Sequence, residues 1–257
     1  FLDMEGFTAL TENLLLRGKE GVEILSSALK ENYSFMVESV QAFGGEIIGF
    51  SGDAFLAVFP QDDGSNCCAS AVRILEESMA SPLIEGIHLK PKIGIGKGVI
   101  ETGIVGELGQ YLFYYKGPAI QRAVEAEKTA HAGEIRVGRR GWSNIVESDP
   151  QGRLLSITKA PRRINLHTVP KNKMRRILLH FFPKELLYRE VEGAFRTAAV
   201  LFIGVDGLKD HRSVEEFARI LLRTIPPQGG FIWHLEFLDK GAGAFAFFGA
   251  PVSFEDN

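Results

Sequence analysis

Two short stretches, Phe1-Leu2-Asp3-Met4-Glu5-Gly6-Phe7-Thr8 and Phe50-Ser51-Gly52-Asp53-Ala54-Phe55, decide the fold of this chain. Each places one aspartate, Asp3 or Asp53, near a glycine at the end of an apolar run. The first stretch leads from a strand into a helix. The second predicts a tight turn between strands at 46–50 and 54–59. Together they predict neighbouring strands that carry both carboxylates at one end.

Hydrophobic periodicity over residues 1–142 predicts alternating helices and strands. Glycine at every second position (Gly94, Gly96, Gly98) marks one of the strands. The predicted helices cover 21–43, 69–79 and 119–131, and the predicted strands cover 46–50, 54–59, 92–100, 111–115 and 134–137. Alternation of this kind, with a hairpin, predicts an α/β (α+β) sandwich of the ferredoxin-like βαββαβ type.

The same framework recurs near the C-terminus without its carboxylates. The strand-plus-glycine unit at 201–208 aligns with 1–7, and Gly204 takes the place of Asp3. A predicted helix follows, then strands at 231–238 and 244–248 joined by a slightly longer turn at Asp239-Lys240-Gly241. Gly243 takes the place of Asp53. The repeat predicts a second copy that has lost its acidic residues.

These patterns divide the chain into three parts. We predict a first, metal-bearing domain over 1–142, a connector over 143–195, and the N-terminal part of a degenerate second domain over 196–257. Prolines and basic clusters at 162–163 and 171–176 favour a solvated linker in the middle part. The chain starts inside a strand without an initiator methionine, so we expect a piece of a longer protein.

Composition restricts the possible functions. The 257 residues are 45% apolar and 24% charged with a net charge of −3, and no global field favours a nucleic-acid partner. Cys67 and Cys68 are adjacent, which excludes a disulfide framework and predicts packing on a helix in a reducing compartment. No apolar run reaches the ~20 residues of a transmembrane segment. We therefore expect a cytoplasmic protein, with any membrane association supplied by regions outside this chain.

Asp3 and Asp53 form the candidate catalytic and metal site. Two carboxylates at adjacent strand ends are hard oxygen ligands suited to Mg²⁺ or Mn²⁺. Gly6 allows close approach of a ligand, and free N–H groups at the start of the following helix favour phosphate. The combination points to a nucleoside triphosphate. Taken singly, Asp3 also fits an N-cap and Asp53 also fits an ordinary turn residue.

These motifs resemble those of class III nucleotidyl cyclases. The stretches 3–8 and 52–54 are similar to the two metal motifs of that family. The glycine-rich stretches 94–96 and 103–106 resemble its later strand pair, and 114–126 resembles its dimer-arm segment. In the second copy, 239–241 and 248–249 resemble the tandem catalytic heads of soluble adenylyl cyclases.

The resemblance implies a role for each matching residue. Asp3 and Asp53 would bind two Mg²⁺ (or Mn²⁺) ions, with the backbone carbonyl of Met4 as a further ligand. Lys92 would contact the β- and γ-phosphates, although it also fits an ordinary strand-edge lysine. The backbone of the loop and first helical turn would hold the phosphates: Glu5, Gly6, Phe7 and Thr8.

Three departures from the family pattern affect catalysis, base recognition and regulation. Gln121 and Glu125 stand where the dimer-arm helix has Asn and Arg, so we expect these groups to come from a second head, whose own arm lies beyond residue 257. His234 occupies the position at which adenylyl cyclases carry the Lys that recognises adenine, although a histidine here also fits an ordinary residue on the face of a sheet. Gly49 and Val124 stand where bicarbonate-responsive relatives carry Lys and Arg, which predicts no stimulation through that site.

The resemblance implies an adenylyl cyclase that converts ATP to cyclic AMP and pyrophosphate with two metals, through intramolecular pairing of two unlike heads. We expect the chain alone to be nearly inactive. Three alternatives stay open: a non-catalytic nucleotide-binding module that regulates a downstream ATPase or repeat region, a guanylyl cyclase, and a diguanylate cyclase, whose turn the stretch 51–55 resembles. The glycine strand and the repeat disfavour the last.

Overall fold

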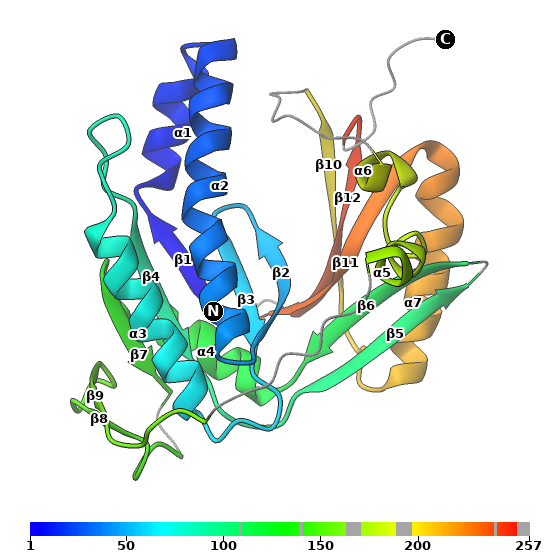
Figure 1. Cartoon of the computed structure of the whole chain (residues 1–257). Coiled ribbons are helices and arrows are strands. Elements are labelled where there is room, and N and C mark those ends of the chain that lie inside the picture. Colours follow the sequence, from blue (N-terminus) through cyan, green and yellow to red (C-terminus); the bar gives the residue numbers. More distant parts are fainter. Residues whose placement is uncertain (108, 139–140, 163–170, 189–196, 239–240, 251–257) are drawn as a thin grey trace. The chain divides into compact units, whose positions relative to one another are not determined.

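The computed structural model describes residues 1–107, 109–138, 141–162, 171–188, 197–238 and 241–250 (Figure 1). The chain forms two compact units. The first contains Phe1–Val99 and Pro118–His167, and the second contains Ile100–Gly117 and Thr168–Asn257. Each unit has its own five-stranded sheet and its own hydrophobic core.

The first unit is built on a sheet with the strand order β2-β3-β1-β4-β7. All neighbours pair antiparallel except β4 and β7, which are parallel. This order confirms the ferredoxin-like arrangement, in which the first strand lies between the third and the fourth. The strands are β1 (Leu2–Glu5), β2 (Glu46–Ser51), β3 (Ala54–Val58), β4 (Lys90–Ile95) and β7 (Glu134–Val137).

Four helices complete the first unit: α1 (Phe7–Leu15), α2 (Lys19–Ala42), α3 (Ser65–Ala80) and α4 (Pro118–Lys128). Gly44 and Gly45 follow the end of α2, as predicted. Helices α2 and α3 pack on each other and supply core residues such as Met36 and Ile74. Cys68 is buried on α3 and forms no disulfide, which confirms its predicted packing role.

Strand β4 shows why its glycines alternate. Ile93 and Ile95 point into the core cluster, so Gly94 between them and Gly96 just after the strand lie toward the opposite face. A Cβ atom on Gly94 would lie 2.0 Å from the carbonyl oxygen of Ala123, and one on Gly96 would lie 2.0 Å from that of Ala119. Helix α4 therefore lies directly on the backbone of β4.

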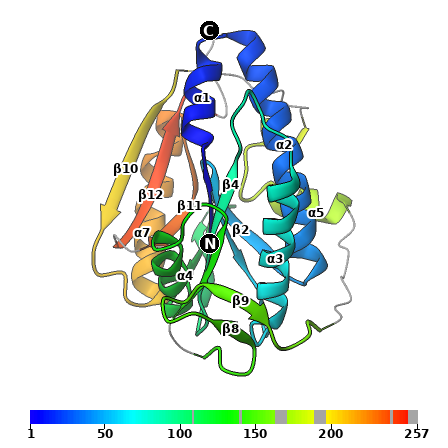
Figure 2. The same ribbon diagram turned by 90° about the vertical axis from the view of Figure 1, so that its left-hand side faces the viewer.

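The segment after β7 differs from the predicted linker. Residues 146–157 form the hairpin of β8 (Val146–Ser148) and β9 (Leu154–Ile157), which lies beside the end of α3 (Figure 2). Trp142 and Ile145 are buried in the first core. Periodicity is weak here because the strands have only 3 and 4 residues.

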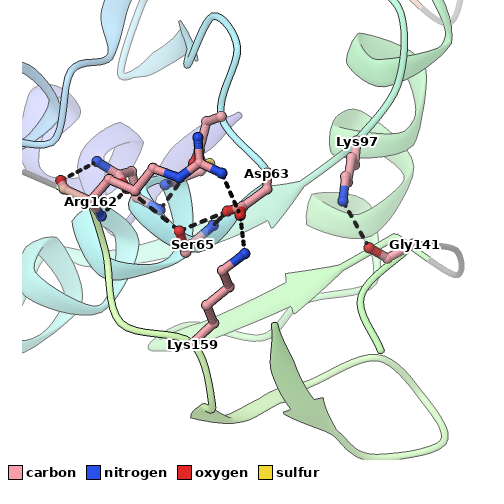
Figure 3. A network of polar contacts seen from close by, with 9 residues as sticks. Asp63, Ser65, Lys97, Gly141, Lys159 and Arg162 are labelled. Atoms are coloured by element: carbon pink, nitrogen blue, oxygen red, sulfur yellow. Dashed lines mark hydrogen bonds and ion pairs between the residues drawn. The ribbon is translucent and has the colours of Figure 1, made fainter. Parts of the chain in front are cut away.

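A polar network ties the chain after this hairpin to the start of α3 (Figure 3). Asp63 accepts hydrogen bonds from Ser65, Lys159 and Arg162. Asn66 is 1% exposed and donates to the carbonyl of Arg162 while accepting from its N–H. Residues up to 162 thus belong to the first unit, beyond the predicted boundary at 142.

The second unit has the strand order β10-β12-β11-β6-β5. Its elements are β5 (Glu101–Glu107), β6 (Gln110–Lys116), α5 (Lys171–Leu178), α6 (Lys184–Tyr188), β10 (Ala199–Val205), α7 (His211–Thr224), a 3₁₀ turn (Pro226–Gln228), β11 (Gly230–Leu238) and β12 (Gly241–Phe248). The predicted strand 92–100 was wrong at its end: β4 stops at Ile95, and β5 belongs to the other sheet. The two glycine-rich stretches are therefore not paired with each other.

Strands β10, β12 and β11 follow the connectivity of β1, β3 and β2, because in both sheets the third strand in sequence lies between the other two. Gly204 and Gly243 are direct cross-strand partners. The predicted turn at 239–241 needs correction, since β12 begins at Gly241 and Gly243 lies inside the strand. Asp239 and Lys240 lie outside the described residues. The assignment of a second copy remains a prediction.

None of the helices in the described ranges combines the length and apolar character needed to span a membrane.

Candidate functional site

The site begins with two paired strands. Leu2 and Met4 are 2% and 3% exposed in the core, so alternation along β1 places Asp3 on the opposite face, the one on which α4 lies. Asp3 and Lys92 are cross-strand partners. The Nζ atom of Lys92 lies 3.0 Å from Oδ2 of Asp3 and 3.0 Å from Oε1 of Glu127 on α4.

Asp53 joins this group from the two-residue turn between β2 and β3. Ser51 pairs with Ala54, and Leu2 pairs with Phe55, which brings the turn to the edge of β1. Burial raises the pKa of Asp53, and the charge of Asp3 raises it further, against the lowering effects of a backbone hydrogen bond and of Lys92. The structure therefore pairs Asp3 with Lys92 and places Asp53 within reach of their charges, while the role of these residues as a site remains a prediction.

Tyr33 on α2 lies beside the same carboxylates. Its ring packs edge-on against Phe50 at 5.4 Å between centroids and also contacts Phe55. Burial raises the pKa of Tyr33, and the charges of Asp53 and Asp3 add to the effect. Within the described residues its buried hydroxyl has no hydrogen-bond partner.

The predicted phosphate loop has the expected backbone form. Gly6 has φ +98°, a left-handed conformation that favours glycine, and α1 begins at Phe7. In the part of the chain that the structure describes, no side chain caps α1, so its first-turn N–H groups are available for an anion. Glu5 and Thr8 are exposed, whereas the side chain of Met4 is in the core and leaves only its backbone for a ligand.

The donor set fits a divalent cation. Two neighbouring carboxylates repel each other, and a bound cation would relieve that repulsion, while a water bound to the cation could donate a hydrogen bond to the hydroxyl oxygen of Tyr33. Among the described residues no cluster of three or more His, Cys, Asp or Glu side chains is arranged to hold a metal. Further ligands would have to be backbone carbonyls, water or substrate oxygens.

Other predicted site residues lie elsewhere. His234 is on β11 in the second unit, where its ring stacks on Phe113 at 5.5 Å and Nε2 lies 3.4 Å from Oε1 of Glu236. Gln121 and Glu125 are on the exposed side of α4. Their roles remain predictions.

Sequence reasoning missed Tyr33 and Glu127. Tyr33 lies at helical spacing among the apolar residues of the predicted helix 21–43, so nothing in the sequence marks it as a site residue. Glu127 had a recognisable signal, because it continues the buried stripe of Ile120, Ala123 and Val124 at helical spacing. A carboxylate in such a stripe indicates a buried cationic partner.

Comparison with known proteins agrees with this geometry. Residues 1–149 match the family described as "Adenylate and Guanylate cyclase catalytic domain". The chain belongs to the class III nucleotidyl cyclase family. This family match confirms the resemblance found in the sequence.

The similar proteins include both adenylate cyclases and guanylate cyclases. The chain is 30% identical over 152 residues to rat adenylate cyclase type 10 and 28% identical over 183 residues to the human protein, covering 55% and 64% of this chain. It spans only 9% and 11% of those relatives. A guanylate cyclase domain from Catenaria anguillulae in complex with GTP has a TM-score of 0.49 at 18% identity, covering 60% of this chain and 89% of that domain.

Proposed function

We propose that this class III cyclase domain converts ATP to cyclic AMP and pyrophosphate. The observation that carries the proposal is the convergence of Asp3 and Asp53 beside the uncapped start of α1. The choice of ATP is supported by the type 10 adenylate cyclases among the relatives. The assignment of magnesium or manganese, and of two ions, belongs to the same proposal.

Each residue has a defined task in this reaction. Asp3 and Asp53 hold the metal ions, which supply charge stabilisation at the phosphates and activation of the attacking hydroxyl. The backbone of Gly6, Phe7 and Thr8 orients the triphosphate at the start of α1. Lys92 is positioned on the same sheet face to neutralise phosphate charge.

A second, unlike head completes the enzyme in this proposal. Strand β6, which lies inside the matched family region, pairs in parallel with β11 at Tyr114 and Leu235. Tyr114 also contacts Nδ1 of His211 at 3.0 Å, and Glu107 forms ion pairs with Arg219 and Arg223. These contacts within the second unit support intramolecular pairing of strands β5 and β6 with the C-terminal segment.

The experiment is a cyclase assay of the full-length protein with ATP and GTP, in Mg²⁺ and in Mn²⁺. We expect cyclic AMP formation that falls by roughly 100-fold or more in Asp3→Asn and in Asp53→Asn, as when a charge-stabilising group is removed from a reacting centre. Glu38→Gln, which changes an exposed carboxylate of α2, is the matched control. Preference for GTP would replace the substrate assignment, and full activity in either Asp variant would refute the site.

A nucleotide-binding module without turnover is the second candidate. Gln121 and Glu125 favour it, because they stand on α4 where the family pattern has Asn and Arg. Binding of a non-reactive ATP analogue, together with absence of cyclic nucleotide from the full-length protein, would establish this alternative.

A further inference from the structure

Glu127 is a buried charge without a task in the reaction proposed above. Its side chain is 8% exposed, and its carboxylate lies 3.0 Å from Nζ of Lys92. Helix α4 can bring it so close because Gly94 has no side chain: a Cβ there would lie 2.2 Å from the backbone nitrogen of Glu127. A buried carboxylate is costly unless it is paired, so this contact needs a physical reason.

Lys92 is shared between two acceptors. Its ammonium group lies 3.0 Å from Asp3 and 3.0 Å from Glu127, and its side chain is 23% exposed. This ion pair occupies a carboxylate oxygen of Asp3 that the proposed metal site needs.

We propose that Lys92 is a resident counter-cation of the metal site and that Glu127 is the positioning residue that receives it when a divalent cation takes Asp3. This inference rests on the proposed function. In the free protein Lys92 neutralises Asp3, which limits the repulsion between Asp3 and Asp53. On metal binding, Lys92 releases Asp3 and keeps its ion pair with Glu127. The affinity of the site for a cation is thus set by competition between two acceptors for one ammonium group.

The test is direct binding of Mn²⁺ to the chain without nucleotide, measured by the electron paramagnetic resonance signal of the free ion. Glu127→Gln removes the charge that draws Lys92 away from Asp3, so Mn²⁺ should bind about tenfold more weakly, the scale of one charged hydrogen bond. The double variant Lys92→Met with Glu127→Gln removes the competitor, and its affinity should return to the wild-type value or exceed it. The control Glu38→Gln should bind like the wild type.

The double variant also addresses folding, because it leaves no unpaired charge between β4 and α4. Rescue of Mn²⁺ affinity by a second substitution cannot arise from simple structural damage. Wild-type affinity in Glu127→Gln, or a double variant no tighter than Glu127→Gln, would overturn the inference. The variant Asp53→Asn separates this inference from the proposed function. If Asp53→Asn binds Mn²⁺ like the wild type, the proposed metal site is wrong. If Asp53→Asn binds Mn²⁺ weakly but Glu127→Gln binds it like the wild type, only the role of Glu127 is refuted.

Discussion

Replacing Gly94 with alanine should separate α4 from β4. The new Cβ would lie 2.0 Å from the carbonyl oxygen of Ala123, whereas ordinary van der Waals contact begins near 3.4 Å. Backbone atoms on both sides cannot rotate away, so the helix must retreat by about 1.4 Å along this line. A radial gap of about 1 Å already forfeits up to half of a dispersion contact.

The expected loss is at least about 3 kcal/mol of unfolding free energy, the upper range for overpacking, because helix and strand must both shift. Gly138→Ala is the matched control. Gly138 lies in the same unit just after β7, and the nearest atom to its added Cβ would be Cβ of Arg122 at 3.4 Å, an ordinary contact. We expect that control to change stability by less than about 1 kcal/mol.

The assay uses the two tryptophans, one of which lies in each unit. In a Trp233→Phe background, fluorescence of the buried Trp142 follows urea unfolding of the first unit alone. A Gly94→Ala midpoint equal to that of the Gly138→Ala control would refute the claim that α4 rests on the bare backbone of β4.

Three further outcomes follow from the described contacts. Burial raises the pKa of Tyr114 to about 12. The contribution of the neutral Tyr114 hydroxyl to the stability of the fold is therefore complete below the unfolded pKa of 10.0 and is lost as pH rises towards 12. Tyrosinate absorbance should show a late-titrating group that Tyr114→Phe removes. Asn66→Ala breaks buried hydrogen bonds to two backbone segments and should cost about 3 kcal/mol in urea unfolding followed by Trp142. The hydrogen bond from Lys159 is the largest of the effects that lower the pKa of Asp63. The Asp63 carboxylate therefore stabilises the fold at pH values above its ordinary pKa of 3.8, and this stabilisation is lost in stronger acid. An acid-unfolding curve unchanged by Asp63→Asn would contradict this.

Much of the site could be predicted because its signals are local. Asp3, three residues before Gly6, and Asp53, in a two-residue turn, are visible in short windows of sequence. Gly94, Gly96 and Gly98 likewise indicated a strand, although β4 ends at Ile95 and contains only Gly94. Turn chemistry and side-chain alternation depend on a few adjacent residues, which is why these predictions agree with the structure.

Predictions that depended on distant partners were less successful. Residues 101–107 continue the glycine pattern of β4, yet they pair with β6 in another sheet. The hairpin 146–157 resembled a linker because its strands are short and its apolar residues are stabilised by the core of α3 and β7. Such choices are made by burial against elements far away in the chain.

The amino-acid sequence by itself determined most helices and strands of the first unit and the positions of Asp3 and Asp53 at a strand and a turn, since each follows from side-chain period and backbone conformation within a few residues. Only the tertiary structure decided that Glu127 and Lys92 meet beside Asp3. The Lys92–Glu127 ion pair requires α4 to lie directly on Gly94 of β4. The distance between helix and strand is set by packing across the sheet and not by any local sequence pattern.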